Sequence, residues 1–261
     1  AMRYTEARLS KLAEEMLRDI DKDTVDFVPN YDNEMMEPTL LPAAFPSILV
    51  NSNVGIGVSM ASSVCSFNLR EICDTTIALM KNPDHELLDT LKGPDFSGGA
   101  LMLYDEENLK NIYRTGRGSV KLRAAYEYDK KSNSISVSQI PASTTVEAIV
   151  EKVISCVKAG KLREVSYIRD DTDLDGLKIT IDLKKGTDPE KVMQKLYRLT
   201  PLQDSYSCNF NILVHGYPKV MGVYEILDEW IKFRTDCVRR RTVFDLNKKK
   251  EKLHLLEGLE K

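Results

Sequence analysis

The sequence predicts an α/β (α+β) fold, a mixture of β-strands and helices followed by one long C-terminal helix. Three patterns carry this prediction. Apolar and polar residues alternate over residues 119–128 and 134–140, which is typical of a β-hairpin. Residues 68–82 carry apolar residues at helical spacing on one face, namely Leu69, Ile72, Cys73, Ile77 and Met80, which is typical of an amphipathic helix. Residues 223–261 contain no proline and only Gly258 as glycine, which predicts a helix of about 55 to 60 Å at 1.5 Å per residue.

Length and composition favour a globular protein of one or two domains. The 261 residues are 42% hydrophobic and 30% charged, values near those of average globular domains. The sequence has no apolar run long enough to span a membrane and begins without the pattern of a signal peptide, so we expect a cytosolic protein. The cysteines are scattered without a CxxC pair and the histidines lie far apart, which predicts reduced thiols and no histidine metal cluster.

The net charge by itself argues against a nucleic-acid-binding protein. Lys and Arg number 37 and Asp and Glu 40, a formal charge of −3. The average hides a basic run, because residues 232–252 contain nine basic and three acidic side chains. A solvated helix face is the simpler interpretation of this run.

The N-terminal third predicts a helix, a connector and a loop. Apolar residues at helical spacing indicate a helix over residues 5–20, and four prolines within residues 25–46 indicate a connector with few regular hydrogen bonds. Residues 47–60 carry two β-branched apolar runs, which predicts a hairpin-like loop with Ile56 near its tip between Gly55 and Gly57.

The rest of the chain alternates helices and strands. Asn68 is the expected N-cap of the helix over residues 68–82, and Gly160 closes a helix over residues 146–157. Further helices are expected over residues 87–91, 106–113 and 189–199, and further strands over residues 100–104, 165–169, 177–183 and 206–214.

An acidic stretch resembles half of a calcium-binding loop. Residues 171–176, Asp-Thr-Asp-Leu-Asp-Gly, match the first half of an EF-hand loop, with Asp182 at its twelfth position. An EF-hand needs a helix on each side, whereas the flanking segments here have strand patterns. We therefore expect an acidic turn of a hairpin and no calcium site.

Two short motifs could contact a nucleic acid. Gly116-Arg117-Gly118 would let the backbone approach a phosphate that Arg117 or Arg114 neutralises, but a helix C-cap followed by a surface arginine explains the same residues. Lys121 follows on the same segment and completes the candidate DNA-binding set. Ile56 is either a core residue under a bend or an apolar wedge of the kind that kinks DNA.

Arg3-Tyr4 precedes the first predicted helix. Tyr4 can simply pack at a helix start. Alternatively it attacks a phosphodiester, for which a phenol with a pKa near 10 needs nearby positive charge, and Arg3 would supply it. Spacing alone favours packing.

Nine strings occur in an order that resembles one enzyme family. They are AMRYTEARL, VDFVPNYD, LPAAFPSILVN, VGIGVSMAS, GPDF, YRTGRGSV, IRDDTDLDGLKI, LTPLQ and VRRRTVFDL. Together they resemble the breakage-reunion (A) subunit of bacterial type IIA DNA topoisomerases, either DNA gyrase or topoisomerase IV, over essentially the whole chain. The resemblance makes this sequence a central fragment of such a subunit.

The resemblance implies roles for particular residues. Tyr4 would form the covalent link to a DNA 5′-phosphate with Arg3 beside it, and Ile56 would intercalate and bend the gate DNA segment. Residues 1–30 would end the catalytic winged-helix region, 31–222 would form the tower domain, and 223–261 would begin the coiled coil. The expected partners are double-stranded DNA, a second copy in the full-length protein, which is then a homodimer, and the topoisomerase B subunit.

The family also implies what this chain lacks. Mg²⁺ and ATP would bind to the B subunit, so no cofactor is expected here, and the fragment by itself should not cleave DNA. Its parent would be an ATP-dependent enzyme acting in the bacterial cytoplasm at the nucleoid. Neither the choice between supercoiling and decatenation nor the fragment's oligomeric state follows from these residues.

Three departures leave an alternative open. Ala44 stands where the family usually has lysine, Ser52 where it has glycine, and residues 65–67 read Cys-Ser-Phe in place of Pro-Pro-His. These changes put the DNA contacts of the Ile56 loop in doubt. A module that bends DNA or serves as a scaffold without cleaving it, such as an inactive paralogue, is the alternative function.

Overall fold

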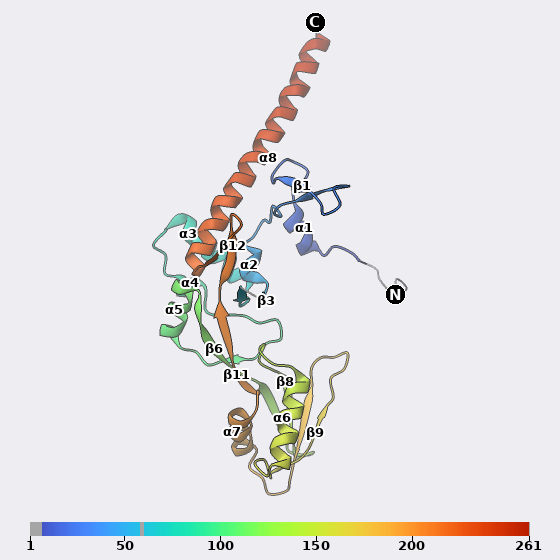
Figure 1. Ribbon diagram of the computed structural model, residues 1–261, viewed down its shortest axis with the longest axis vertical. Helices are drawn as coiled ribbons and strands as arrows, with labels where there is room; N and C mark the ends of the chain where they lie inside the picture. Colours follow the sequence, from blue (N-terminus) through green and yellow to red (C-terminus); the bar gives the residue numbers. More distant parts are fainter. Residues whose placement is uncertain (1–6, 58–59, 261) are drawn as a thin grey trace.

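The computed structural model describes residues 7–57 and 60–260. The chain forms two sheets with their covering helices, one after the other along the long axis of the molecule (Figure 1). A long helix extends from the end opposite the four-stranded sheet. All strand pairs within the sheets are antiparallel and helices cover the sheets. This confirms the predicted α/β (α+β) class and the long C-terminal helix.

The N-terminal segment is less helical than its apolar spacing predicts. Helix α1 (Lys11–Leu17) starts after Ser10, whose side chain accepts a hydrogen bond from the Ala13 backbone N–H, and the left-handed conformation of Asp19 follows its end. The connector over residues 25–46 contains a short hairpin of β1 (Phe27–Pro29) and β2 (Met36–Pro38). Pro29 and Pro38 occupy the ends of these strands, where the missing N–H donor costs little.

A five-stranded sheet forms the centre of the molecule, with the order β3-β4-β11-β6-β5. Its strands are β3 (Asn53–Ile56), β4 (Ala61–Val64), β5 (Leu101–Met102), β6 (Arg117–Arg123) and β11 (Gln203–Asn209). One face packs on helices α3 (Leu69–Lys81), α4 (Leu87–Thr90), α5 (Glu106–Thr115) and the start of α8 (Val223–Glu260). Within the described residues, the other face carries no such layer of helices.

A four-stranded sheet with its own core lies at the opposite end from α8 (Figure 1). Its order is β7-β8-β10-β9, with strands β7 (Ala125–Asp129), β8 (Ser134–Gln139), β9 (Val165–Asp170) and β10 (Ile179–Leu183). Helices α6 (Val146–Lys158) and α7 (Pro189–Leu199) bury Ile149, Val153 and Leu196 against it.

Two predicted strands are each divided between two sheets. Residues 119–128 split at the fully buried Ala124, which separates β6 from β7. Ala124 donates its N–H to the Leu202 carbonyl and accepts a hydrogen bond from the Tyr197 hydroxyl. Residues 206–214 split at the buried Phe210, which separates β11 from β12 (Asn211–Val214), the partner of β13 (Tyr217–Val220). An alternating pattern continues through such a junction, so it cannot reveal it.

Two further predictions need correction. Residues 47–50 form a helical turn, α2 (Ser47–Val50), and the hairpin uses only β3 and β4. In α3 the buried residues are Ile72, Thr75, Thr76 and Leu79, whereas Ile77 and Met80 of the predicted face are exposed. Thr75 and Thr76 tolerate burial because their hydroxyls donate to the carbonyls of Glu71 and Ile72.

The acidic stretch over residues 171–176 lies in a turn between strands, as expected, because β9 and β10 flank it. Arg169 forms ion pairs with Asp171 at 3.0 Å and Asp182 at 2.6 Å. The Thr180 hydroxyl hydrogen-bonds to Asp171 and lowers the pKa of that carboxyl. Two carboxylates of the EF-hand pattern are thus held by protein groups.

Candidate nucleic-acid interface

One face of the five-stranded sheet is polar, basic and largely exposed. Directly paired residues share a face, and the pairs place Val54, Ser63, Asn209 and Arg117 in one row across β3, β4, β11 and β6. Alternation along the strands adds further residues to this face. We call it the open face, and it includes Val54, Ile56, Ala61, Ser63, Arg117, Ser119, Lys121, Arg123, Gln203, Ser205, Ser207 and Asn209.

The composition of the open face differs sharply from that of the opposite face. Ser119, Ser205 and Ser207 are small and exposed, while Val120, Tyr206 and Cys208 between them are buried in the core. Small polar side chains let a flat ligand approach the sheet, and hydroxyls can donate to phosphate oxygens. The open face is therefore suited to a large polyanion.

Ile56 lies at one corner of the open face. It ends β3, pairs with Ala61 across the hairpin, and is 93% exposed. This exposure excludes the interpretation of Ile56 as a core residue under a bend and agrees with an apolar side chain at a loop tip. An apolar side chain this exposed costs about 1.5–3 kcal/mol relative to its buried state, which a partner can recover.

Arg117 and Lys121 point to the open face, with Ser119 between them in the alternation of β6. Both are exposed, and neither forms an ion pair with any residue in the described ranges. At about 3.4 Å per residue, the two cations lie about 14 Å apart along the strand. They are available to neutralise phosphates.

Arg114 is separated from the other two cationic candidates. It lies in the last turn of α5, on the helical layer behind the sheet, and its guanidinium donates to Asn111 Oδ1 at 3.3 Å. It lines a cavity together with Tyr224 and Glu225 at the start of α8. Because Arg114 and Arg117 are close in sequence, they were expected to contact one phosphate. Arg114 instead belongs to the helical layer and Arg117 to the open face of the sheet, and the turn at Gly116 lies between them.

Gly116 and Gly118 are required by backbone conformation and close packing. Gly116 caps α5 in the left-handed conformation, with φ of 70°, and donates its N–H to the Ile112 carbonyl. A Cβ atom at Gly118 would lie 2.6 Å from the Ile112 side chain. The C-cap interpretation is therefore the correct one for Gly116.

Three of the positions that depart from the family pattern, Cys65, Ser66 and Phe67, do not lie on the open face. Cys65 and Phe67 are buried, Phe67 with its ring edge-on to Tyr113 and Phe210, and the Ser66 hydroxyl donates to the Asp95 carbonyl. Replacing Pro-Pro-His by these residues thus changes the core beneath the sheet. Ser52 is exposed just before β3, next to the hairpin.

Arg3 and Tyr4 lie outside the described residues. The chain that follows them is fastened to α8 by ion pairs, from Asp19 to Arg241 at 2.9 Å and from Arg240 to Asp23 at 3.0 Å and Asp26 at 2.8 Å. Burial raises the pKa of Asp19, but hydrogen bonds from Arg241 and Lys22 outweigh it and lower that pKa. Part of the basic run over residues 232–252 is thus paired within the chain.

Sequence reasoning missed part of the open face. Ser205 and Ser207 come from β11, about 85 residues after their partners on β6, and only the strand register brings them together. Arg123 was also missed, although its signal is present: Arg117, Ser119, Lys121 and Arg123 occur at every second position and hence on one side of a strand.

No helix among residues 7–57 and 60–260 combines the length and apolar character needed to cross a membrane. Likewise, the described side chains contain no group of three His, Cys, Asp or Glu residues placed to hold a metal ion.

Comparisons with known proteins agree over the full length. The family model described as the A subunit of DNA gyrase/topoisomerase IV matches residues 1–261. The DNA gyrase A subunit of Borrelia hermsii is 44% identical over 99% of this chain and 33% of that protein. The same subunit of Ureaplasma parvum is 41% identical over 99% of the chain and 31% of its own length.

A relative from a plant is equally similar. The chloroplastic/mitochondrial DNA gyrase A subunit of Nicotiana benthamiana is 42% identical over 99% of this chain and 29% of that protein. The chain thus spans about a third of the length of the curated relatives it matches. With a family match that includes every residue, the chain belongs to the family of DNA gyrase/topoisomerase IV A subunits.

Proposed function

We propose that this chain is the part of a type IIA DNA topoisomerase A subunit that binds and bends the gate DNA segment and carries the tyrosine that cleaves it. The observation that carries the proposal is the almost fully exposed Ile56 at the corner of a basic open face. An apolar wedge beside phosphate-binding cations is the arrangement by which proteins kink duplex DNA.

The cleavage chemistry is assigned to Arg3 and Tyr4 by family membership. The Tyr4 oxygen attacks a DNA phosphodiester, forms the bond to the 5′-phosphate and releases the 3′-hydroxyl, and the reverse reaction rejoins the strand. Arg3 stabilises the charge that develops on the phosphate. This transesterification conserves the energy of the phosphodiester, so rejoining needs no further energy source.

The proposal places the chain in a larger assembly. Its partners are double-stranded DNA, a second A subunit in a homodimer, plus the topoisomerase B subunit, and it acts in the cytoplasm at the nucleoid. Mg²⁺ and ATP are proposed to bind to the B subunit, as the resemblance implies. No step of the proposal passes through a metal held by this chain.

The wedge can be tested by measuring DNA bending. We expect Ile56→Ala to reduce the bend of a 30-bp duplex labelled at both ends, read by energy transfer, and to weaken binding roughly tenfold, since about 1.4 kcal/mol of apolar contact is lost. Ile77→Ala is the matched control, because Ile77 is an exposed isoleucine of α3 on the opposite side of the sheet and should leave bending and binding unchanged. Equal bending by all three proteins contradicts the wedge.

In the alternative function, the chain binds DNA through the same face but does not cleave it. A bending or scaffold module that does not cleave is favoured by the altered residues near the hairpin, Ser52 among them. Both functions predict a bend that depends on Ile56. Only the topoisomerase predicts a covalent adduct at Tyr4, so the adduct separates them.

A further inference from the structure

Two cysteines from different strands meet in the core beneath the five-stranded sheet. Cys65 directly follows β4 and Cys208 lies in β11, and their sulfur atoms are 4.0 Å apart although the residues are 143 positions apart in the chain. Both are free thiols, with exposed fractions of 0% and 4%. We call Cys65 and Cys208 the thiol pair, and the proposed function assigns no role to it.

The strand that leads into Cys65 has a weak backbone attachment to the sheet. Strands β4 and β11 share one register pair, Ser63 with Asn209, whereas β11 and β6 share seven. Two side chains add to this attachment, because Ser63 Oγ donates to the Ser207 carbonyl at 2.7 Å and Asn209 Nδ2 donates to the Ala61 carbonyl at 2.9 Å. Local opening follows the weakest attachment, so β4 separates from β11 more easily than β6 does.

The backbone positions of the thiol pair are compatible with a disulfide. A disulfide joins residues whose Cα atoms are about 4.4–6.8 Å apart, and residues that face each other on antiparallel strands are about 4.5–5.5 Å apart. Cys65 and Cys208 lie within two residues of the register pair of Ser63 and Asn209, so neighbouring strands hold them. Rotation about the Cα–Cβ bonds then brings the two sulfur atoms together without a change of fold.

The two thiols differ in how readily they lose a proton. Burial raises the pKa of the Cys65 thiol, whereas the hydrogen bond with Cys65 lowers the pKa of the Cys208 thiol. The thiolate and not the thiol attacks an oxidant, so Cys208 reacts first. Cys65 is then the neighbouring thiol that attacks the oxidised sulfur.

We propose that the thiol pair is a redox site that hydrogen peroxide converts into a disulfide between Cys65 and Cys208. The Cys208 thiolate attacks the O–O bond, its sulfur becomes a sulfenic acid, and the departing hydroxide takes up the proton that Cys208 lost and leaves as water. The Cys65 sulfur attacks the sulfenic sulfur, and its proton leaves with the hydroxyl group as a second water. The two thiols lose two electrons, which the peroxide gains, so no further reactant is needed.

The peroxide reaches the buried sulfurs through local opening of β4. Ala61 is exposed and Ser62 and Ser63 are half-buried, so the chain enters the core only one residue before Cys65. A cavity of about 420 Å³ is lined by Ser66, the next residue along the chain. Hydrogen peroxide is small and needs only a limited separation of the strands. Its reaction with the thiol pair is therefore limited by opening and slower than with an exposed thiol.

The disulfide fastens the hairpin of β3 and β4 to the centre of the sheet. Strand β3, which ends at Ile56, pairs only with β4, so β4 alone joins the hairpin to β11. A covalent bond at the base of β4 suppresses the opening that the single register pair allows. Cys65 is one of the positions that depart from the family pattern, so relatives with proline there lack this redox site. The inference stands on the thiol pair and does not depend on DNA binding.

Peptide mass spectrometry after peroxide treatment tests the inference. The protein is incubated with hydrogen peroxide, its remaining thiols are blocked with iodoacetamide under denaturing conditions, and it is digested without a reductant. We expect one crosslinked product that contains Cys65 and Cys208 and that dithiothreitol separates. Amide hydrogen exchange of β3 and β4 should be slower in the oxidised protein by about tenfold or more, because the disulfide opposes local opening.

A second buried cysteine supplies the matched control. Cys156 is 6% exposed, and its thiol faces the Leu199 carbonyl at 3.9 Å. Cys65→Ser and Cys208→Ser should each lose the crosslinked product, and Cys156→Ser should keep it. Recovery of both wild-type thiols in the blocked form, or a crosslink from either of them to a different cysteine, overturns the inference. Neither result bears on the proposed function, which the bending assay tests separately.

Discussion

Replacing Tyr4 by phenylalanine in the complete A subunit, combined with its B subunit, is expected to abolish covalent attachment to DNA. The substitution removes the phenolic oxygen that we propose as the nucleophile, and phenylalanine provides no other nucleophile. The measurement is the yield of protein joined to a labelled duplex after denaturation. We expect an adduct on the 5′-phosphate with the wild-type enzyme and a yield at background with the variant.

The control for this substitution is another tyrosine of the same region. Tyr31 is 95% exposed and lies in the turn between β1 and β2, so Tyr31→Phe removes a hydroxyl that has no proposed role and should leave the adduct yield unchanged. DNA bending should survive in both variants, because Ile56 is intact. A covalent adduct that persists in Tyr4→Phe contradicts the assignment, and its absence from the wild-type enzyme favours the non-cleaving alternative.

Gly116→Ala is expected to cause a large loss of stability next to the open face. A Cβ atom there would lie 2.2 Å from the Met221 carbonyl oxygen and 3.1 Å from Phe210 Cβ. The residue also has φ of 70°, which costs a side chain about 1–2 kcal/mol. With overpacking of about 1–3 kcal/mol added, we expect a loss of about 3 kcal/mol and a Tm lower by roughly 6–12 °C.

Gly116→Ala is expected to be destabilising because Gly116 lies at the junction of β6, β11 and the segment that leads into α8. Gly116 accepts a hydrogen bond from the Phe210 N–H at 2.8 Å, and Phe210 accepts one from the Met221 N–H at 3.1 Å. A side chain at residue 116 would force apart the strand that carries Arg117 and the segment that leads into α8. Loss of stability should therefore come with weaker DNA binding.

Gly98→Ala is the matched control for this prediction. A Cβ atom at Gly98 would have no heavy atom within 4 Å, and the residue does not require a left-handed conformation. Its replacement should leave Tm within about 2 °C of the wild type, because most substitutions without packing or strain effects change stability by under about 0.5 kcal/mol. A Gly116→Ala protein as stable as this control contradicts the account of the junction.

Local signals predicted the elements well where caps or prolines mark their ends. The Asn68 side chain accepts hydrogen bonds from the N–H groups of Arg70 and Glu71 at the start of α3. Asp188 and Pro189 open α7 in the same way, and Gly160 follows α6 with φ of 71°. These signals act within one helical turn, so a single sequence contains all the information they need.

Long-range arrangement escaped sequence reasoning for a physical reason. The alternating pattern from Arg117 to Asp129 is the same whether the strand stays in one sheet or crosses to another at Ala124. The buried face of α3 was misjudged because Thr75 and Thr76 bury their hydroxyls by bonding to the preceding turn. Hydrophobicity alone assigns such residues to the surface.

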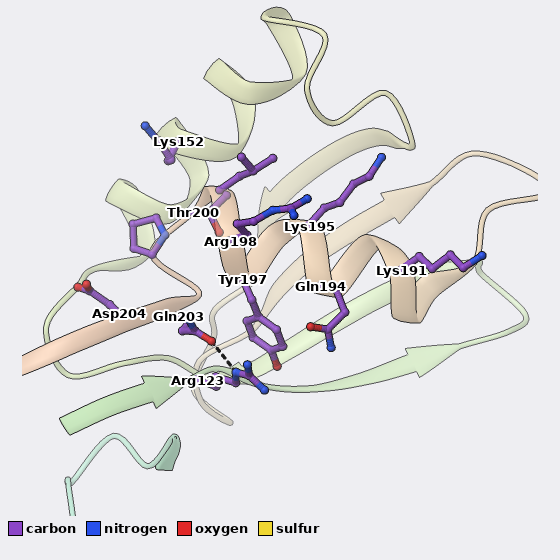
Figure 2. A pocket seen from close by; sticks show the side chains of 12 residues that line it. Arg123, Lys152, Lys191, Gln194, Lys195, Tyr197, Arg198, Thr200, Gln203 and Asp204 are labelled. Carbon is purple, nitrogen blue, oxygen red and sulfur yellow. Dashed lines mark hydrogen bonds between the residues drawn. The ribbon is translucent and has the colours of Figure 1, made fainter. Parts of the chain in front are cut away.

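The candidate site was predictable in part. The position of Ile56 between two glycines left both a core residue and an apolar tip open, and the exposed side chain agrees with the tip. Arg117 and Lys121 share one strand, but their grouping with Arg114 followed sequence adjacency, and the turn at Gly116 separates them in space. Arg123, Lys152 and Arg198 line one cavity (Figure 2) without any local signature in the sequence, because strand register and helix packing bring them together.

The central claim is that the open face is the surface on which the duplex lies. It is tested most directly by placing the photoreactive amino acid p-benzoylphenylalanine at Ser119, at the middle of the open face on β6, and at Ile77, an exposed position of α3 on the opposite side of the sheet. Each protein is irradiated with a labelled 30-bp duplex and crosslinked DNA is measured. We predict strong crosslinking from position 119 and none from position 77. Crosslinking from position 77 that equals or exceeds that from position 119 contradicts the account.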